Sequence, residues 1–200
     1  MRADLELLTA WRGGSKAAGG ELFERHFECL RRFFRTKVPM TDVEDLVQRT
    51  LLACLESVDG FRAEARFRTY LLTIARRELY GFFNRNNRDK IRQGLDCTVS
   101  SIRDLGISPS RAALASEEQV IIADAMAALP VDFQVTLELY YWEQLRGPEL
   151  AEVLEISPNT VRTRLHRARA ALREALARVR FGDISDAHLE DSVAGIGAQL

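Results

Sequence analysis

Apolar residues recur at helical spacing along nearly the whole chain, and this pattern leaves little room for any other secondary structure. Between residues 21 and 38 one wide apolar face consists of Leu22, Phe23, Phe27, Leu30, Phe33 and Phe34. The next segment repeats the pattern with Val43, Val47, Leu51, Cys54, Leu55 and Val58. We find no convincing apolar–polar alternation of the kind that marks a half-buried strand. The sequence therefore predicts an all-α protein.

Breakers and caps predict where these helices begin and end. A short first helix is expected over residues 5–11, and the expected breaks are Gly13-Gly14, Gly19-Gly20 and Pro39. Two capping boxes are expected at helix starts, Thr41 with Glu44 and Ser116 with Gln119. Later helices are expected over residues 67–83, 117–128, 131–144 and 148–154.

A long stretch without periodicity divides the chain. From residue 85 to about 115 it carries Gly94, Ser100-Ser101, Gly106 and Ser108-Pro109-Ser110. A structureless stretch of this length is unusual inside one compact domain, so it predicts a domain boundary. We expect two small helical domains, residues 1–84 and 116–180, joined by a flexible linker over residues 85–115. The acidic tail, residues 181–200, is expected to be frayed or to fold back on the basic helix before it as an autoinhibitor.

The segment from residue 148 to 172 predicts a helix-turn-helix. Its first helix buries Leu150, Ala151, Val153 and Leu154, and Glu155-Ile156-Ser157 forms the turn. Ser157 can cap the second helix, and Pro158 suits its first position, where no backbone donor is needed. An apolar stripe then runs along this helix through Val161, Leu165, Ala168, Leu172 and Val179. Such a second helix enters the major groove by its N-terminal residues.

The charge on the second helix points to an anionic ligand. Five arginines lie between its apolar residues, at positions 162, 164, 167, 169 and 173, opposed only by Glu174. A solvated surface helix would be the ordinary explanation, but such helices normally carry acidic partners one turn away. The net charge of −1 conceals this asymmetry, because residues 157–180 and 76–92 are basic whereas residues 42–64 are acidic. The chain is therefore expected to touch nucleic acid at two places and another partner elsewhere.

Composition excludes several other classes. Cys29, Cys54 and Cys97 are scattered and odd in number, so neither a disulfide nor a zinc site is expected, and Cys54 is a small core residue. No signal peptide opens the chain and no apolar run could span a bilayer, which predicts a cytoplasmic protein with no membrane contact. No cofactor is expected. An enzyme would need clustered ligands or a phosphate loop, but the three histidines lie far apart.

In four stretches the sequence resembles the extracytoplasmic-function (ECF) sigma factors of bacterial RNA polymerase, members of the sigma-70 family. Residues 21–27 resemble the family's opening helix, residues 42–50 its polymerase-binding segment, and residues 67–76 its −10-reading segment. The Leu129-Pro130 turn and residues 157–169 resemble its −35-reading domain. The resemblance covers roughly residues 20–178 in the family's order and spacing. It implies a protein without chemistry of its own, which places core RNA polymerase on a promoter and holds the opened strand.

The resemblance assigns DNA contacts to both domains. Candidates for the −35 element are Arg162, Thr163, Arg164, His166 and Arg167, because arginine can bond guanine in bidentate fashion. Arg169 and Arg173 lie deeper and are expected to meet phosphate or solvent. Candidates for the −10 element are Arg62, Arg66, Arg68, Tyr70, Arg76 and Arg77, since single strands are held by aromatic platforms beside a cationic groove. Phe67 is expected in the core, and the loop over residues 59–66 is expected to hold a flipped base.

The resemblance also implies protein partners. Exposed contacts to core polymerase are expected from Asp45, Gln48, Arg49 and Leu52, with Val43, Val47 and Leu51 buried on the other side of the helix. Anti-sigma factors commonly control this family, and such a partner would be expected to wedge between the domains or to cover their polymerase faces.

The sequence departs from the family pattern in four places. Arg146-Gly147-Pro148 replaces the usual start of the first helix of the helix-turn-helix, and Glu155 stands where glycine is common in the turn. Arg77 and Gly81 replace a common asparagine and a common aspartate, which leaves the details of −10 recognition open. A free-standing helix-turn-helix regulator is the alternative function. It would use the same second domain but would need a dimer interface or a ligand pocket in the first.

Overall fold

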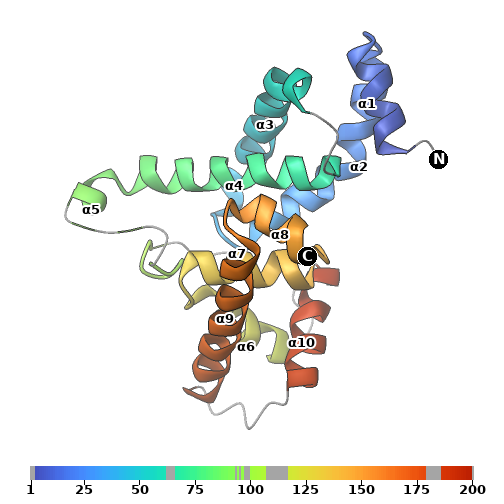
Figure 1. The fold of residues 1–200 in the computed structure, drawn as a ribbon. Helices are drawn as coiled ribbons and strands as arrows, with labels where there is room; N and C mark the ends of the chain where they lie inside the picture. Colours follow the sequence, from blue (N-terminus) through green and yellow to red (C-terminus); the bar gives the residue numbers. More distant parts are fainter. Residues whose placement is uncertain are drawn as a thin grey trace.

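The computed structural model describes residues 3–61, 66–92, 94, 96, 100–106, 117–178 and 186–199 (Figure 1). The expected all-α class is confirmed, since these residues form helices and turns with one isolated bridge between Ser101 and Pro130. The first domain contains α1 (Asp4–Arg12), α2 (Lys16–Arg35), α3 (Met40–Ser57), the 3-10 turn η1 (Val58–Gly60), α4 (Phe67–Asn86) and α5 (Arg88–Arg92). The second contains α6 (Glu117–Ala127), α7 (Val131–Tyr141), α8 (Gly147–Leu154), α9 (Pro158–Arg178) and α10 (Asp186–Gln199).

The beginning of α2 differs from the sequence prediction. The expected break at Gly19-Gly20 is wrong, because α2 begins at Lys16 and runs through both glycines. Ser15 caps it by accepting a hydrogen bond from the Ala18 N–H at 3.3 Å. Gly19 is needed for close packing: a Cβ there would lie 2.8 Å from Cδ1 of Trp11 on α1. The glycine therefore serves the α1–α2 contact rather than a turn.

The start of α3 also differs. The expected Thr41–Glu44 capping box is absent, because α3 already begins at Met40 and Glu44 accepts a hydrogen bond from Arg31 Nε at 3.0 Å. Ser116, the cap expected for the later box, lies outside the described residues. The buried positions of α3 include Val43, Val47 and Cys54, as expected, while Leu51 is half-buried. Leu55 was expected inside and is 52% exposed.

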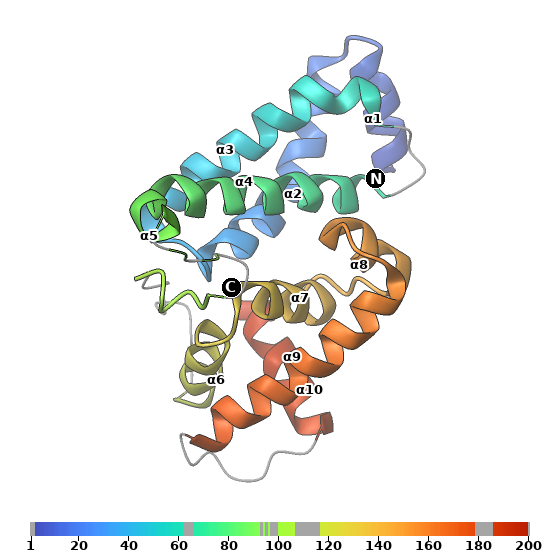
Figure 2. The ribbon, with the colours of Figure 1, turned by 60° about the vertical axis from the view of Figure 1, so that its left-hand side comes forward.

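The second domain is built around α7, which packs against α8, α9 and α10 (Figure 2). The expectation of a frayed tail is wrong, because residues 186–199 form α10 against α6 and α7. Val193 and Ile196 of α10 are fully or almost fully buried. The Trp142 indole Nε1–H donates to the Val193 carbonyl oxygen at 2.7 Å. Gly197 packs closely against the Trp142 ring, and a Cβ at this position would lie 2.3 Å from the ring.

The two domains are in direct contact, so they are not merely tethered. Helix α8 packs on α4 (Figure 1). One cluster of buried apolar side chains joins Phe83 of α4 to Val135 and Leu150 of the second domain. The described part of the expected linker is also structured. It contains α5 and a turn at residues 100–106, where Ile102 is buried and the Ser100 carbonyl accepts the Val131 N–H at 2.9 Å.

Candidate nucleic-acid interface

Helix α9 is capped and oriented as the sequence predicts. Ser157 Oγ accepts a hydrogen bond from the Thr160 N–H at 3.1 Å, which satisfies one of the free amides at the helix start. Val161, Ala168 and Leu172 are buried against the rest of the second domain. The opposite side of the N-terminal half of α9 therefore faces outward.

The turn before α9 contains backbone strain. Glu155 follows α8 with φ of 55° and ψ of 41°, in the left-handed region that favours glycine. The N–H groups of Glu155 and Ile156 still bond back to α8, to the carbonyls of Glu152 and Ala151, both at 3.1 Å. These bonds close the first helix and hold the angle between α8 and α9, which completes the helix-turn-helix.

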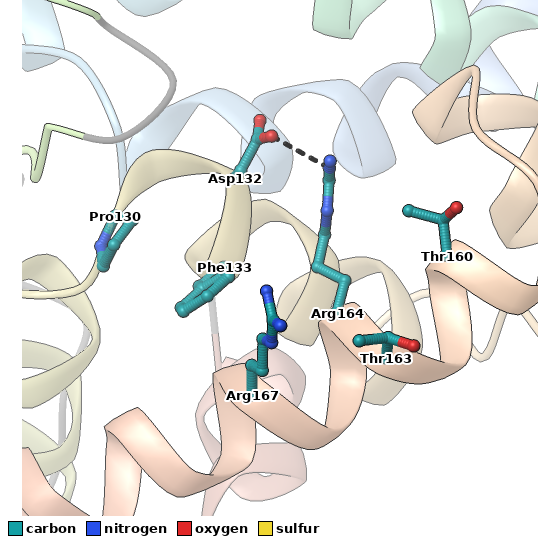
Figure 3. A pocket seen from close by; sticks show the side chains of 7 residues that line it. All are labelled: Pro130, Asp132, Phe133, Thr160, Thr163, Arg164 and Arg167. Atoms are coloured by element: carbon teal, nitrogen blue, oxygen red, sulfur yellow. Dashed lines mark ion pairs between the residues drawn. The ribbon is translucent and has the colours of Figure 1, made fainter.

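The outward face of α9 carries four of the five expected −35 residues. Arg162, Thr163, His166 and Arg167 are exposed. Arg164 differs, because its guanidinium points back toward α7, where Nη1 lies 2.9 Å from Asp132 Oδ2 (Figure 3). This contact is a charge pair without the alignment of a hydrogen bond, so Arg164 Nη1 is a buried donor with no hydrogen-bond acceptor.

A groove lies beside this charge pair, and both Asp132 and Arg164 line it. Its volume is about 340 Å³, and the lining side chains are Pro130, Asp132, Phe133, Thr160, Thr163, Arg164 and Arg167 (Figure 3). Arg167 lies beside the Phe133 ring at the edge of the groove (Figure 3). Two cations and two hydroxyls line the groove, and the Asp132 carboxylate neutralises part of the charge of Arg164. Arg167 and the hydroxyls of Thr160 and Thr163 are therefore the groups that could hold an anionic group next to α9.

Arg169 has a structural role instead of the expected contact with phosphate or solvent. Its guanidinium carbon lies 5.0 Å from the Tyr140 ring centre and 5.7 Å from that of Tyr141. Its Nε donates to the Tyr141 hydroxyl at 2.9 Å, and its Nη2 forms an ion pair with Glu190 of α10 at 3.1 Å. The side chain thus joins α9 to α7 and α10.

The arginines of α4 face the second domain. Arg76 Nη1 lies 3.2 Å from Glu155 Oε2, and Arg77 binds the other oxygen of the same carboxylate. At the start of α4, Arg66 pairs with Glu149 at 3.3 Å, and Arg68 binds Glu143. Arg62, another expected −10 residue, lies outside the described residues.

An aromatic cluster lies at the start of α4. The Tyr70 ring is tilted against the Phe61 ring with centres 4.6 Å apart, and the Tyr70 hydroxyl is 2.6 Å from Ser57 Oγ. Phe67 is buried, as expected. Next to this cluster a groove of about 350 Å³ is lined by Asp4, Leu5, Leu8, His26, Phe61, Arg66, Phe67 and Arg68. Its mixture of rings and cations is typical of surfaces that hold unstacked bases.

His26 in this groove is neutral at pH 7. Burial lowers the pKa of the imidazole below 6.5, although a hydrogen bond to Asp4 at 2.8 Å opposes the shift. Burial raises the pKa of Asp4, but hydrogen bonds from Arg25 and His26 outweigh it and hold that pKa below its ordinary value. The Asp4–His26 contact is therefore a hydrogen bond from a neutral ring to a carboxylate, which fixes α1 against α2.

The outer face of α3 contains every residue expected to meet polymerase. Asp45, Gln48, Arg49 and Leu52 are all exposed, and Arg49 Nε donates to Asp45 Oδ2 at 2.7 Å. Leu52 is 57% exposed, and with Leu55 it forms an apolar strip on this face. Sequence reasoning missed Leu55 as an exposed residue. Its spacing of three from Leu52 was the available signal, since such pairs share a helix face.

The described residues contain no cluster that could hold a metal and no helix long and apolar enough to cross a membrane. Burial raises the pKa of both the Cys29 and the Cys54 thiols to about 12, so both are protonated and unreactive at neutral pH. Cys29 Sγ donates to Glu143 Oε2 at 3.2 Å.

These features define a two-domain DNA-binding protein, with a helix-turn-helix in one domain and an arginine-rich aromatic helix in the other. The family model for sigma-70 region 2 matches residues 22–89, and that for sigma-70 region 4 matches residues 119–172, together more than half of the chain. The chain belongs to the sigma-70 family, as a sigma factor of the ECF type. Sigma factors direct transcription initiation and are not enzymes.

Relatives of similar length share this organisation. The chain is 26% identical over 172 residues to the ECF RNA polymerase sigma-E factor of Haemophilus influenzae, a match that covers 83% of this chain and 91% of that protein. It is 28% identical over 144 residues to the ECF RNA polymerase sigma factor SigW of Bacillus subtilis, which covers 68% and 75% of the two chains.

Two solved structures have the same fold. CnrH, in complex with the cytosolic domain of CnrY, matches with a TM-score of 0.65 and 24% identity over 88% of this chain and 99% of that chain. The sigma factor RpoE of Bartonella quintana, in complex with the anti-sigma factor NepR, matches with a TM-score of 0.57 and 24% identity over 75% and 91%.

Proposed function

We propose that this sigma factor docks on core RNA polymerase through the outer face of α3, reads the −35 element with α9 and captures the −10 strand with α4. The observation that carries the proposal is the outward face of α9. There Arg162, Thr163 and Arg167 are exposed on a helix whose other side is buried and whose start is capped. A helix held in this way can enter a major groove as a rigid body.

The residues on this face are expected to make different contacts with DNA. Arg162 and Arg167 have the exposure needed to reach base edges, where bidentate bonding to guanine gives about 1–3 kcal/mol of discrimination. Thr163 and His166 lie between them and suit a base edge or a sugar. Arg164 is held by Asp132 with one donor unused, so it is better placed for a phosphate beside the groove than for a base.

The first domain supplies the other two contacts. The groove beside Phe61 and Phe67 accepts a flipped base of the −10 element, with Tyr70 stacking near it and the arginines of α4 meeting the backbone. On α3, the strip of Leu52 and Leu55 together with Asp45 and Gln48 docks on polymerase, because an exposed apolar strip rimmed by charge is typical of a protein interface.

Promoter binding requires the two domains to separate. The centres of the −35 and −10 elements lie about 25 base pairs apart, which is roughly two and a half turns or about 85 Å of B-DNA. In the structure α8, the first helix of the −35-reading motif, packs directly on α4. The arrangement described above is therefore a form that the protein leaves when it joins polymerase on a promoter.

The function is tested by transcription in vitro with core polymerase on a promoter library. We expect core polymerase plus this chain to select promoters with two shared elements. Arg162→Ala/Arg167→Ala should lose selection at the upstream element alone, while Arg178→Ala, at the exposed far end of α9, serves as the control. A free-standing regulator would bind duplex DNA tightly without polymerase, and that result would replace the proposal.

Two further parts of the proposal concern the cellular location of the protein and its regulation. We place the protein in the cytoplasm, because the polymerase it serves works there. We also propose control by an anti-sigma factor, in keeping with the structural neighbour RpoE, which was solved in complex with the anti-sigma factor NepR. Co-purification of the intact chain from its own cells tests this.

A further inference from the structure

Carboxylates of the second domain line the same face of α4 that carries the expected −10 arginines. Glu143 and Glu149 meet Arg68 and Arg66 at the start of the helix, and Glu155 meets Arg76 and Arg77 more than two turns further along. All three acids lie between the end of α7 and the turn after α8, so one short segment covers the length of this face. Figure 1 shows α8 lying along α4 at this place.

The coverage withdraws part of this face from solvent. The Arg76 side chain is 15% exposed, and Glu143 is 3% exposed between Arg68 and Arg32, whose Nη2 lies 2.6 Å from Glu143 Oε1. Phosphates cannot fully bond Arg68 and Arg76 while the carboxylates occupy them. Arg66 and Arg77 are 82% and 62% exposed, so their charges are neutralised by Glu149 and Glu155 without being covered. The acids hold the positions that a nucleic-acid backbone would need, with the same sign of charge.

The arginines are incompletely satisfied in this arrangement. Arg68 Nε and Arg76 Nε are buried and donate to no acceptor among the described residues. A buried donor without a partner costs free energy, so the closed arrangement holds these side chains less well than a fully bonded site would. Another anionic partner can therefore replace the carboxylates at these arginines.

The other functional faces stay open in the same structure. Asp45, Gln48 and Leu52 on α3 are exposed, and α3 lies on the side of α4 away from α8 (Figures 1 and 2). Arg162 and Arg167 on α9 are exposed as well. Of these three faces in the described residues, the strand-binding face is the one that the second domain partly covers, so polymerase can dock before that face is released.

We propose that the second domain is a built-in inhibitor of the first: the carboxylates of Glu143, Glu149 and Glu155 occupy the cationic face of α4 and exclude single-stranded DNA until polymerase holds the domains apart. The inference rests on the proposed role of α4 in strand binding. The inhibition would keep the free protein from binding single-stranded DNA elsewhere in the cell.

The test measures single-strand binding by the free, full-length protein. The probe is a fluorescent random-sequence single strand of about 16 nucleotides, long enough to cover one site. Salt is fixed, because phosphate contacts depend on it. In Glu149→Gln/Glu155→Gln both altered side chains are partly exposed, at 29% and 42%, so the fold is retained. We expect this variant to bind about fivefold more tightly than the wild type, as the closed population falls.

A charge-matched control separates release of α4 from a general loss of negative charge. Glu152→Gln/Glu174→Gln removes the same charge from exposed positions of the second domain, and neither residue pairs with α4 in the described structure. The control should stay within about twofold of the wild type. Equal gains in the two variants would overturn the proposal, as would no gain in either.

A second variant strengthens the effect and locates it. Glu143→Gln frees both Arg32 and Arg68, so it should raise single-strand affinity further and raise the radius of gyration above the roughly 16–17 Å of a compact chain this long. Adding Arg76→Ala/Arg77→Ala to Glu149→Gln/Glu155→Gln should remove the gain, because the released arginines provide it. A gain that survives this addition would contradict the proposal. If Glu143→Gln fails to fold, the exposed variants decide the matter.

Transcription with core polymerase distinguishes the inference from the proposed function. If the wild type supports no initiation with core polymerase, the proposed function fails whatever the free protein binds. If the wild type and Glu149→Gln/Glu155→Gln initiate equally while the free variant gains no single-strand affinity, the function stands and the inhibition is disproved.

Discussion

Lys37 and Glu138 form an ion pair across the domain interface, with both side chains withdrawn from solvent. Lys37 follows α2 and Glu138 lies in the middle of α7, where Thr36 and Gln134 also donate to its carboxylate, at 3.0 and 2.8 Å. Burial lowers the pKa of Lys37 and raises that of Glu138, while their mutual attraction opposes both shifts. The pair therefore fixes how the two domains meet.

Breaking this pair on one side should be costly. Glu138→Gln leaves the Lys37 charge buried without a counter-ion, and we expect a loss of about 3–5 kcal/mol in the free energy of unfolding. Lys37→Met/Glu138→Gln removes both charges and should recover most of that loss. Urea unfolding of the two single variants and the double variant measures the coupling, and strictly additive losses would show that the pair is not coupled.

The outward face of α9 should respond residue by residue. Arg167→Ala is expected to weaken binding of the polymerase complex to its −35 element by about 1–3 kcal/mol and to relax selectivity at one base pair. Arg178→Ala, on the same helix and paired only with Glu174 among the described residues, should change little. Binding assays on mutated promoters measure both, and a uniform loss across all sequences would indicate a phosphate contact instead.

The outer face of α3 should be required for polymerase binding but not for folding. Substituting Asp45 and Gln48 with alanine should abolish co-elution with core polymerase while circular dichroism stays unchanged, because both side chains are exposed. Glu24→Ala, an exposed change on α2, is the control. Retained binding by the double variant would exclude this face as the docking site.

Stability should fall on mild acidification because of His26. Its pKa in the folded protein lies below the ordinary 6.5, so between these two values the unfolded chain binds more protons than the folded one. The free energy of unfolding should therefore decrease as the pH falls from about 7 through 6.5 toward the folded pKa. Urea titrations at several pH values test this. His26→Gln should remove this component, and a dependence that persists in the variant would assign it to other groups.

Two glycines of α10 should respond in opposite ways. Gly197→Ala would drive a methyl group into the Trp142 ring, so α10 should detach and the fluorescence of Trp142 should shift. Gly195→Ala has no atom within 4 Å of the new group and should stabilise the helix by up to about 1 kcal/mol. Thermal unfolding of the pair compares them directly, and equal behaviour would mean that α10 does not dock on Trp142.

The sequence predicts local structure better than it predicts contacts between domains. The Ser157 cap, the helix-turn-helix and the exposed face of α3 follow from residues that are close in the chain, and the structure agrees with each. Errors arose where a contact between two helices decides the outcome. Gly19 looks like a break until Trp11 lies against it, and Glu44 looks like a cap until Arg31 binds it.

The sequence indicates the interface between the two domains only weakly. Glu138 stands among apolar residues of α7, and Glu143 follows just after that helix. Both are buried, and such acids require buried cations. The periodicity of the sequence does not identify these cations. Arg32, Lys37 and Arg68 come from a different domain, 111, 101 and 75 residues away from their acids in the chain, and only the folded structure brings them together. The role of each expected DNA-contacting residue stays a prediction.

The left-handed turn at Glu155 has a consequence for comparing related chains. Glycine would fit that backbone with less strain, but glycine has no carboxylate to offer Arg76 and Arg77. The side chain at this position is thus determined by the neighbouring domain rather than by the turn that contains it. An acid found at the equivalent turn of another family member, opposite a pair of arginines, would serve as a one-letter marker of the same closed arrangement.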